Sequence, residues 1–408
     1  MNNDTKKKNK KKKKGKWVKP RHKFFRNFFN SNLGVYSRIK YNIKICKIPK
    51  DKRGQYLVLY NHQTAFDQFF VGMVMRDPVY YLATEDIFSM GFASTIIKYL
   101  VAPISIRKQT TDVSAIMNCL RVVREGGTIA IAPEGNRTYS GKTEYMNPSI
   151  ATLVKQLKLP VAILRIEGGY GVHPRWSDVV RRGKMKAYVS RIIEPSEVKS
   201  MDDATLCELI ENELYVNEAN DKNVFKSKKS AEYLERALYT CPECGLAKLE
   251  SHKDIIKCTK CGLAVKYTET TRLEGVDREI PFPFVNDWYE HQKALVNGLD
   301  LSEYTDDAIF CDEAKMFEVI PNKRKYLYKN HVDMSLFGDR IEIDGERWSF
   351  SELSAVVVLG KNKLNIYRDG HIYQFKGDKR FNALKYVNIF HRFKNIESKN
   401  EEACFLGL

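Results

Sequence analysis

The sequence predicts an α/β fold at the start of the chain: a layered domain in which a mixed sheet is flanked by helices, followed by a small cysteine-rich unit and a β-rich domain. Short apolar runs alternate with helical patterns up to about residue 235. Two Cys-x2-Cys pairs follow, and beyond residue 309 alternating segments flank Asp-Gly pairs. With 408 residues and 43% hydrophobic content, the chain can form two globular domains around a small insert.

The apolar runs that predict strands in the first domain lie at residues 56–60, 100–106, 128–133, 161–167 and 186–193. Helical patterns cover residues 67–75, 112–124 and 147–158. Strands and helices that alternate in this way are typical of a sheet with helices packed on it.

A candidate base and its orienting group follow the first of these strands. Asn61 and His62 end the strand, and Asp67 begins the next helical pattern. His62 titrates near neutral pH, so it can accept a proton from a hydroxyl, and Asp67 can hold the imidazole in one tautomer. Five residues span about 140° around a helix, so the pair requires His62 to lie in the turn before the helix. An ordinary loop histidine is the alternative interpretation.

A second polar group follows the strand at residues 128–133 and consists of Glu134, Gly135, Asn136 and Arg137. Gly135 permits a close approach of the backbone to a ligand, and the Arg137 guanidinium matches phosphate oxygens. Glu134 can align Arg137 or a substrate hydroxyl, and Arg107 follows another strand. Ligands of open α/β sheets bind at the carboxyl ends of strands, so these groups predict an anion-binding site. A turn with a surface ion pair is the alternative.

These residues resemble the motifs of the glycerolipid acyltransferases, and within them the 1-acylglycerol-3-phosphate (lysophosphatidic acid) acyltransferases. The four blocks in family order are Asn61-His62-x4-Asp67, residues 103–107, Glu134-Gly135-Asn136-Arg137-Thr138 and residues 159–161. The resemblance covers residues 25–235. The chain departs from the family at Thr64, where serine is usual, at Asn136 and Thr138, which replace Thr and Ser, and at Ile106, where Asp is frequent.

The resemblance implies that His62 is the general base, that Asp67 orients it, and that the acceptor is bound by Arg107, Glu134, Gly135, Asn136 and Arg137. The implied reaction moves a fatty acyl group from acyl-CoA or acyl carrier protein to 1-acylglycerol 3-phosphate and forms phosphatidic acid for phospholipid biosynthesis. No covalent acyl-enzyme is expected, because the sequence has no Gly-x-Ser-x-Gly elbow. Ile106 removes a charge beside Arg107, so another lysolipid or glycerol 3-phosphate stays open as the acceptor.

The start of the chain is strongly basic. The net charge is +18, and residues 1–26 hold thirteen Lys or Arg against the single Asp4. We expect residues 1–24 to be disordered and attracted to an anionic membrane surface. Aromatic residues at helical spacing follow and suit either an interfacial helix or one packed on the core; they are Phe24, Phe25, Phe28 and Phe29. The sequence shows neither an apolar run long enough to span a bilayer nor a visible signal peptide. The expected location is therefore cytoplasmic, peripheral on the inner face of the cell membrane.

Two cysteine pairs predict a structural zinc site. Cys241 and Cys244 are followed by Gly245, and Cys258 and Cys261 by Gly262, with thirteen residues between the pairs. Two tight turns that each present two thiolates resemble a zinc ribbon, and four thiolates leave no open catalytic position. A disulfide framework is disfavoured because a cytosolic chain is kept reduced.

The rest of the chain predicts a linker at residues 269–308 and a β-rich domain at residues 309–408. Residues 231–239 extend a helical pattern toward the ribbon, which we place at residues 238–268. Hairpins are indicated at Asp344-Gly345 and Asp369-Gly370, and an apolar stripe predicts a closing helix at residues 380–395. Hairpins capped by a terminal helix resemble a pleckstrin-homology-like barrel. Such a domain would bind lipid headgroups or a protein, or serve only for dimerisation or packing.

A different class of function stays open. An adaptor with an inactive acyltransferase fold could bind anionic membranes or nucleic acid through the tail and the ribbon. This alternative is disfavoured because the expected catalytic and binding residues are all present: His62, Asp67, Glu134, Gly135 and Arg137. A membrane is favoured over nucleic acid as the partner.

Overall fold

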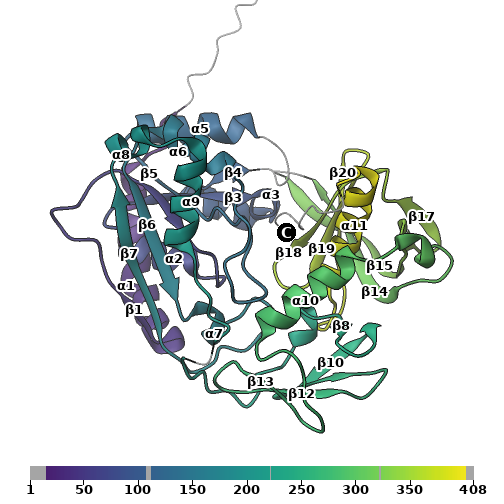
Figure 1. The fold of residues 1–408 in the computed structure, drawn as a ribbon. Coiled ribbons are helices and arrows are strands. Elements are labelled where there is room, and N and C mark those ends of the chain that lie inside the picture. The colour runs from purple at the N-terminus through teal and green to yellow at the C-terminus, as the bar shows by residue number, and fades with distance from the viewer. Residues whose placement is uncertain (1–14, 107–111, 221, 321–322, 401–408) are drawn as a thin grey trace, which may run out of the picture.

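The computed structural model describes residues 15–106, 112–220, 222–320 and 323–400. Figure 1 shows the layered N-terminal domain on the left, the C-terminal sheet on the right and the cysteine hairpins below. Residues 1–14 of the predicted basic tail, and Arg107, lie outside the described residues.

The N-terminal domain is built on a seven-stranded mixed sheet of order β1-β7-β6-β2-β5-β3-β4. Only the β6/β7 pair is antiparallel among the described pairs of this sheet. The strands are β1 (Ile43–Ile45), β2 (Leu57–Tyr60), β3 (Val79–Thr84), β4 (Ile104–Ile106), β5 (Thr128–Ile131), β6 (Val161–Glu167) and β7 (Met185–Ile193). The predicted strand at residues 100–106 is shorter, because a helix continues to Leu100. The α/β layered fold is confirmed.

Helices cover both faces of this sheet. Leu57 and Leu59 of β2 pack into the core under one set of helices, whereas Val58 and Tyr60 pack into the core of the opposite face. A strand with apolar side chains on both faces needs such double cover. The helices are α1 (Pro20–Tyr41), α2 (Asp67–Val74), α3 (Glu85–Phe88), α4 (Phe92–Leu100), α5 (Val113–Arg124), α6 (Ser149–Leu157), α7 (Gly169–Val172), α8 (Pro195–Ser200) and α9 (Asp203–Leu214).

The middle of the chain forms the cysteine hairpins and a helix. The short strands are β8 (Thr240–Cys241), β9 (Gly245–Leu246), β10 (Leu249–His252), β11 (Ile255–Cys258), β12 (Ala264–Tyr267) and β13 (Leu273–Gly275). Residues 231–239 hold only the 3-10 turn η1 (Leu234–Arg236), which follows Tyr233 in a left-handed conformation. The segment expected to be a linker contains β13, α10 (Val285–Asn297) and η2 (Leu301–Tyr304).

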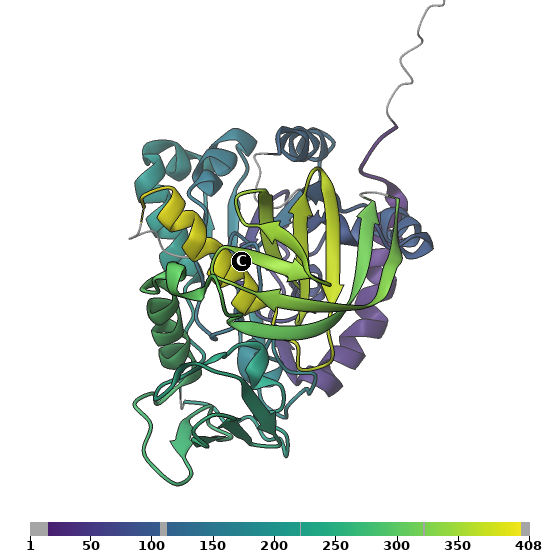
Figure 2. The same ribbon diagram turned by 90° about the vertical axis from the view of Figure 1, so that its right-hand side faces the viewer.

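The C-terminal sheet has seven antiparallel strands in the order β17-β16-β15-β14-β20-β19-β18. Two meanders of four and three strands join through β14 and β20, and helix α11 (Leu384–Glu397) follows, so the β-rich domain and its closing helix are present. Figure 2 looks onto this curled sheet. The strands are β14 (Phe310–Ile320), β15 (Arg324–Leu336), β16 (Arg340–Ile343), β17 (Glu346–Ser349), β18 (Leu353–Leu359), β19 (Lys363–Arg368) and β20 (His371–Lys376).

One hydrophobic core joins the three parts. It runs from Tyr139, Tyr170 and Trp176 of the N-terminal domain through the cysteine hairpins into the C-terminal sheet. The parts are therefore packed together rather than strung on exposed linkers. No helix in the described part of the chain is both long and apolar enough to cross a bilayer.

Candidate active site

His62 lies in the turn between β2 and α2, as the spacing required. Its Nδ1 is 2.8 Å from Oδ2 of Asp67, the first residue of α2. Asp67 is fully buried, and its oxygens also accept the backbone N–H groups of Gln63 and Thr64 and the hydroxyl of Thr64 at 2.6 to 2.9 Å. The Asp67 carboxylate therefore fixes both the turn and the imidazole. In the neutral ring Nδ1 then carries the proton and Nε2 is the basic atom.

The strand order brings the second motif beside the first. β2 and β5 are parallel neighbours, so their carboxyl ends meet at one edge of the sheet. Oε1 of Glu134 accepts the backbone N–H of His62 at 2.8 Å, and the backbone N–H of Thr138 donates to the carbonyl of His62 at 3.2 Å. Oε2 of Glu134 accepts the backbone N–H of Glu144. Glu134 thus holds the backbone of the His62 turn, and burial raises the pKa of its carboxyl to about 8.

Gly135, Asn136 and Arg137 line the cavity that His62 faces. Gly135 has φ +67°, a left-handed conformation that favours glycine, and a Cβ there would meet nothing within 4 Å. Glycine is therefore favoured at this position by the backbone conformation and not by a lack of space. The guanidinium of Arg137 makes no ion pair with any residue that the structure describes. Burial lowers its pKa to about 10, which leaves it charged at neutral pH.

Arg175 is a second arginine at this site, and the sequence motifs do not reveal it. It follows α7, is 2% exposed, and donates from a terminal nitrogen to the carbonyl of Arg137 at 2.7 Å. Its guanidinium carbon lies over the face of the Tyr139 ring, 4.2 Å from the ring centroid. Its only sequence signal is an arginine between Pro174 and Trp176 after a glycine-rich turn.

The charges around His62 act in opposite directions on its pKa. Burial lowers the pKa from 6.5, the Asp67 carboxylate raises it, and the positive charges of Arg137 and Arg175 lower it again; the net direction is downward. A neutral imidazole is therefore favoured at neutral pH, which is the form that can accept a proton.

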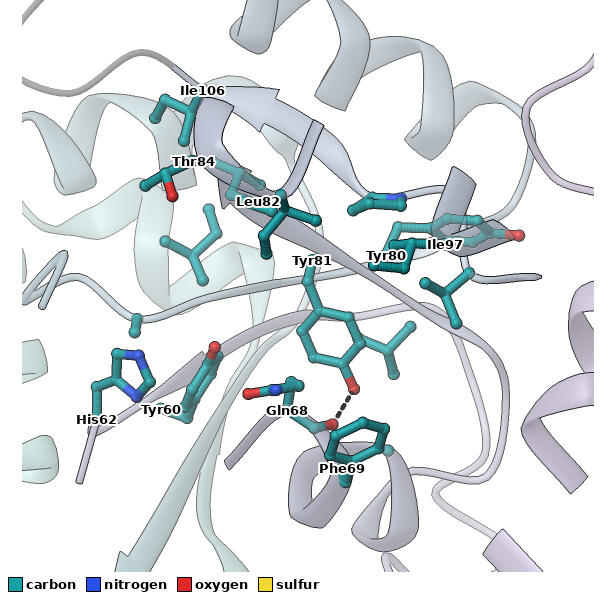
Figure 3. Close-up of a pocket in the computed structure, with 18 of the residues that line it drawn as sticks. Tyr60, His62, Gln68, Phe69, Tyr80, Tyr81, Leu82, Thr84, Ile97 and Ile106 are labelled. Atoms are coloured by element: carbon teal, nitrogen blue, oxygen red, sulfur yellow. Dashed lines mark hydrogen bonds between the residues drawn. The ribbon is translucent and has the colours of Figure 1, made fainter. Parts of the chain in front are cut away.

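A cavity of about 630 Å³ extends from these polar groups into the domain. Its long wall is β3, with helices α1, α2 and α4 around it, and most of its lining is apolar. Figure 3 shows His62 beside Tyr60 at the lower left, Ile106 above them, and Leu82 and Ile97 toward the centre and right of the view. The hydroxyl of Tyr81 donates to the carbonyl of Gln68 at 2.6 Å and closes one side. A long apolar space next to a charged end suits an amphiphilic ligand.

Asn61 has a structural part in the site. Its side chain donates to the carbonyl of Ile166 and accepts the N–H of the same residue, at 2.8 and 2.7 Å. These two bonds tie the end of β2 to β6 and fix where the His62 turn begins.

The four cysteines predicted as metal ligands come together. Cys241 and Cys244 lie on the β8/β9 hairpin, Cys258 and Cys261 on the β11/β12 hairpin, and all four Sγ atoms lie within 4.8 Å of one another. Tetrahedral Zn–S bonds of about 2.3 Å place sulfur atoms about 3.8 Å apart, and Sγ of Cys241 is 3.6 Å from Sγ of Cys261. Gly245 and Gly262, at φ +70° and +79°, close the two knuckles. The donor set fits a metal ion.

Helices α1 and α4 expose apolar side chains next to the cavity. Phe24 and Ile39 on α1 are 67% and 80% exposed, and Phe92 on α4 is 78% exposed. The helices adjoin, with Arg21 stacked on Tyr99 at 4.0 Å. Other residues of the same two helices, Phe29, Leu33 and Ile97, line the cavity. The same two helices thus carry both exposed apolar side chains and apolar side chains that line the cavity.

A histidine held by a buried carboxylate, beside two arginines and at the end of an apolar cavity, can transfer a proton next to an amphiphilic, anionic ligand. Residues 42–167 match the model of the acyltransferase family. The chain therefore carries an acyltransferase domain, and this match includes both motifs around His62 and Arg137.

Comparison with solved structures gives five matching chains. One is the crystal structure of the 1-acyl-sn-glycerophosphate (LPA) acyltransferase PlsC from Thermotoga maritima, with 18% identity, a TM-score of 0.38, and coverage of 46% of this chain and 77% of that chain. Comparison with curated proteins found no match.

Proposed function

We propose that this protein moves a fatty acyl group from acyl-CoA or acyl carrier protein to 1-acylglycerol 3-phosphate and forms phosphatidic acid. The observation that carries this proposal is the pairing of His62 with Asp67 at the charged end of the apolar cavity. The acceptor supplies a hydroxyl, a phosphate and an acyl chain. His62 can act on the hydroxyl, Arg137 can bind the phosphate, and the apolar cavity can hold the acyl chain.

In this reaction Nε2 of His62 takes the proton of the acceptor hydroxyl as its oxygen attacks the thioester carbonyl. The carbon–sulfur bond then breaks, the thiolate leaves with the electron pair, and the imidazolium returns the proton to it. Asp67 stabilises the imidazolium and keeps the tautomer, as the carboxylate of a catalytic triad does. The substrate hydroxyl occupies the place that serine has in such a triad.

Arg137 is proposed to bind the acceptor phosphate, with Arg175 beside it. An arginine without a carboxylate partner among the described residues is available for a ligand anion, and the guanidinium fork matches phosphate oxygens. On the basis of the sequence motifs, Arg107 and Asn136 are proposed as further residues that bind the acceptor. Glu134 is proposed to act through the backbone of His62 rather than by touching the substrate.

We further propose that the protein works at the cytoplasmic surface of a membrane as a peripheral protein. The apolar side chains that α1 and α4 expose, together with the basic charge at the start of the chain, suit an anionic lipid surface. Both helices also line the cavity, so a lipid acceptor would enter it from the same side. The cysteine cluster is proposed to hold zinc in a structural role.

The test is a mass-spectrometric assay of the purified protein and its His62→Ala variant with acyl-CoA or acyl carrier protein and a panel of acceptors. Phosphatidate formed by the wild type and lost in a folded His62→Ala variant is the expected result. Product from another lysolipid or glycerol 3-phosphate would correct the acceptor. The absence of any product would overturn the enzyme proposal in favour of a membrane-binding adaptor.

A further inference from the structure

The turn between β18 and β19 brings the C-terminal sheet to the candidate active site. Val358, Leu359 and Gly360 line the same cavity as His62 and Arg137, although Gly360 is 298 positions from His62 and 223 from Arg137 in the chain. Figure 1 shows β18 and β19 on the side of the C-terminal sheet that faces the N-terminal domain. The cavity wall is therefore built from two parts of the chain.

Arg175 joins this turn to Arg137. Its Nε donates to the carbonyl of Gly360 at 2.7 Å, and a terminal nitrogen donates to the carbonyl of Arg137 at the same distance. One guanidinium thus holds both backbone segments. Because the group is planar and rigid, it fixes the distance between the turn and the Arg137 loop.

Further contacts hold the turn against the N-terminal domain. The hydroxyl of Tyr139 donates to the carbonyl of Lys361 at 2.9 Å. Nζ of Lys361 donates to the carbonyl of Ser177 at 2.6 Å and to Asp178 at 2.9 Å. Asp178 is held in turn by the buried Arg236 at 2.9 and 3.2 Å. The network is charge-assisted and combines the buried Arg236 with Asp178 at the surface. Together with Arg175 and Tyr139, it attaches the turn to the N-terminal domain at several points.

The turn lies at the charged end of the cavity. It shares Arg175 with Arg137, whereas β3 and α4 form the apolar length of the cavity. An acceptor whose phosphate contacts Arg137 would therefore place any group attached to that phosphate next to the turn. Leu359 is the half-buried, uncharged side chain that the turn presents there.

We propose that the β18/β19 turn is the headgroup wall of the acceptor pocket and that Leu359 limits the size of the group on the acceptor phosphate. This inference rests on the proposed function and assigns a role in that function to the C-terminal sheet. Arg175 is its positioning residue, since it acts through the backbone of Gly360 and Arg137. An acceptor whose phosphate carries no further group fits against this wall. An acceptor whose phosphate carries a headgroup is hindered by the side chain of Leu359.

The test compares Leu359→Ala and Leu359→Trp in the full-length protein. With one acyl donor, kcat and KM are measured for lysophosphatidate and for lysophosphatidylglycerol, whose phosphate carries a glycerol. We expect Leu359→Ala to raise the ratio of kcat/KM for the larger acceptor to that for lysophosphatidate by about tenfold, which is the low end of the discrimination that one methylene group produces in a pocket. Leu359→Trp should lower the same ratio.

Leu353→Ala is the matched control. Leu353 begins the same strand and is buried, but it does not line the cavity, so its loss should lower thermal stability and leave the acceptor ratio unchanged. If the acceptor ratio is unchanged in both Leu359 variants while the wild type still acylates lysophosphatidate, the role of the turn as a headgroup wall is overturned and the proposed function stands. A wild-type protein that acylates no acceptor overturns the proposed function and this inference together.

Discussion

The carboxylate of Glu134 accepts the backbone N–H of His62 at 2.8 Å, across 72 positions of sequence. The same carboxylate accepts the N–H of Glu144, and Thr138 donates back to the carbonyl of His62. The loop after β5 therefore fixes the turn that carries the candidate base. Parallel pairing of β2 with β5 makes this possible, because it places the ends of both strands at one edge.

This relationship predicts a measurable loss of stability. Glu134→Ala leaves the partly buried N–H groups of His62 and Glu144 without their acceptor, which should cost about 1–3 kcal/mol in the free energy of unfolding. Glu134→Gln keeps one carbonyl oxygen and should lose less. Urea unfolding of the three proteins measures the difference; equal stability of all three would show that water replaces the carboxylate.

Asp67→Asn tests the role of the carboxylate that orients His62. The amide cannot stabilise an imidazolium and can impose the wrong tautomer, so kcat should fall by about 10² to 10⁴. KM for the acceptor should change much less, because Asp67 is fully buried and does not line the cavity. Steady-state kinetics measure the effects on kcat and on KM separately. A variant that loses only acceptor affinity would contradict this role.

The pH dependence of the reaction should report the shifted His62. Burial outweighs the Asp67 contact and lowers the pKa of His62 below 6.5, so the acid limb of kcat/KM should lie below pH 6.5. Arg137 contributes to this lowering. Removing its charge in Arg137→Gln should raise the pKa of His62 and move the acid limb to higher pH. Loss of substrate binding alone would lower the rate and leave the limb in place.

Metal analysis should find about one zinc ion per chain, held by the four cysteines. Cys258→Ser should lose the metal and lower the melting temperature, since the hairpins share a core with the C-terminal sheet. Cys207→Ser, on α9 in the N-terminal domain, is the control and should retain the zinc. A metal-free wild type with an unchanged melting temperature in chelator would contradict the structural role.

Membrane binding should depend on the exposed face of α1. The double variant Phe24→Glu, Phe28→Glu removes two apolar contacts and adds negative charge, so partitioning onto anionic vesicles should fall at least about tenfold. Val276→Glu is the matched control, because Val276 is 50% exposed in the cysteine-rich part of the chain. Co-sedimentation at low and high salt measures both. Equal loss in the two proteins would point to a general charge effect.

Several elements followed from local patterns. The five-residue spacing of His62 and Asp67 excluded a common helix and required a turn, and the structure has that turn. The Asp-Gly pairs mark hairpins, with Asp344 and Asp369 in left-handed conformations. The helical pattern at residues 231–239 was misleading, because the buried Glu235 and Arg236 contact Ser251, Arg380 and Asp178 instead of lying on a solvated helix face.

The sequence by itself determined the chemistry available to this protein: a base with its carboxylate, an arginine loop, four thiolates and an α/β layered domain. Each follows from residues close together in the chain, where spacing limits geometry. Only the tertiary structure decided that Glu134 holds the His62 turn, that Arg175 lies beside Arg137 and that Leu359 borders the same cavity. These contacts depend on strand order and on packing between distant segments, which no local pattern encodes.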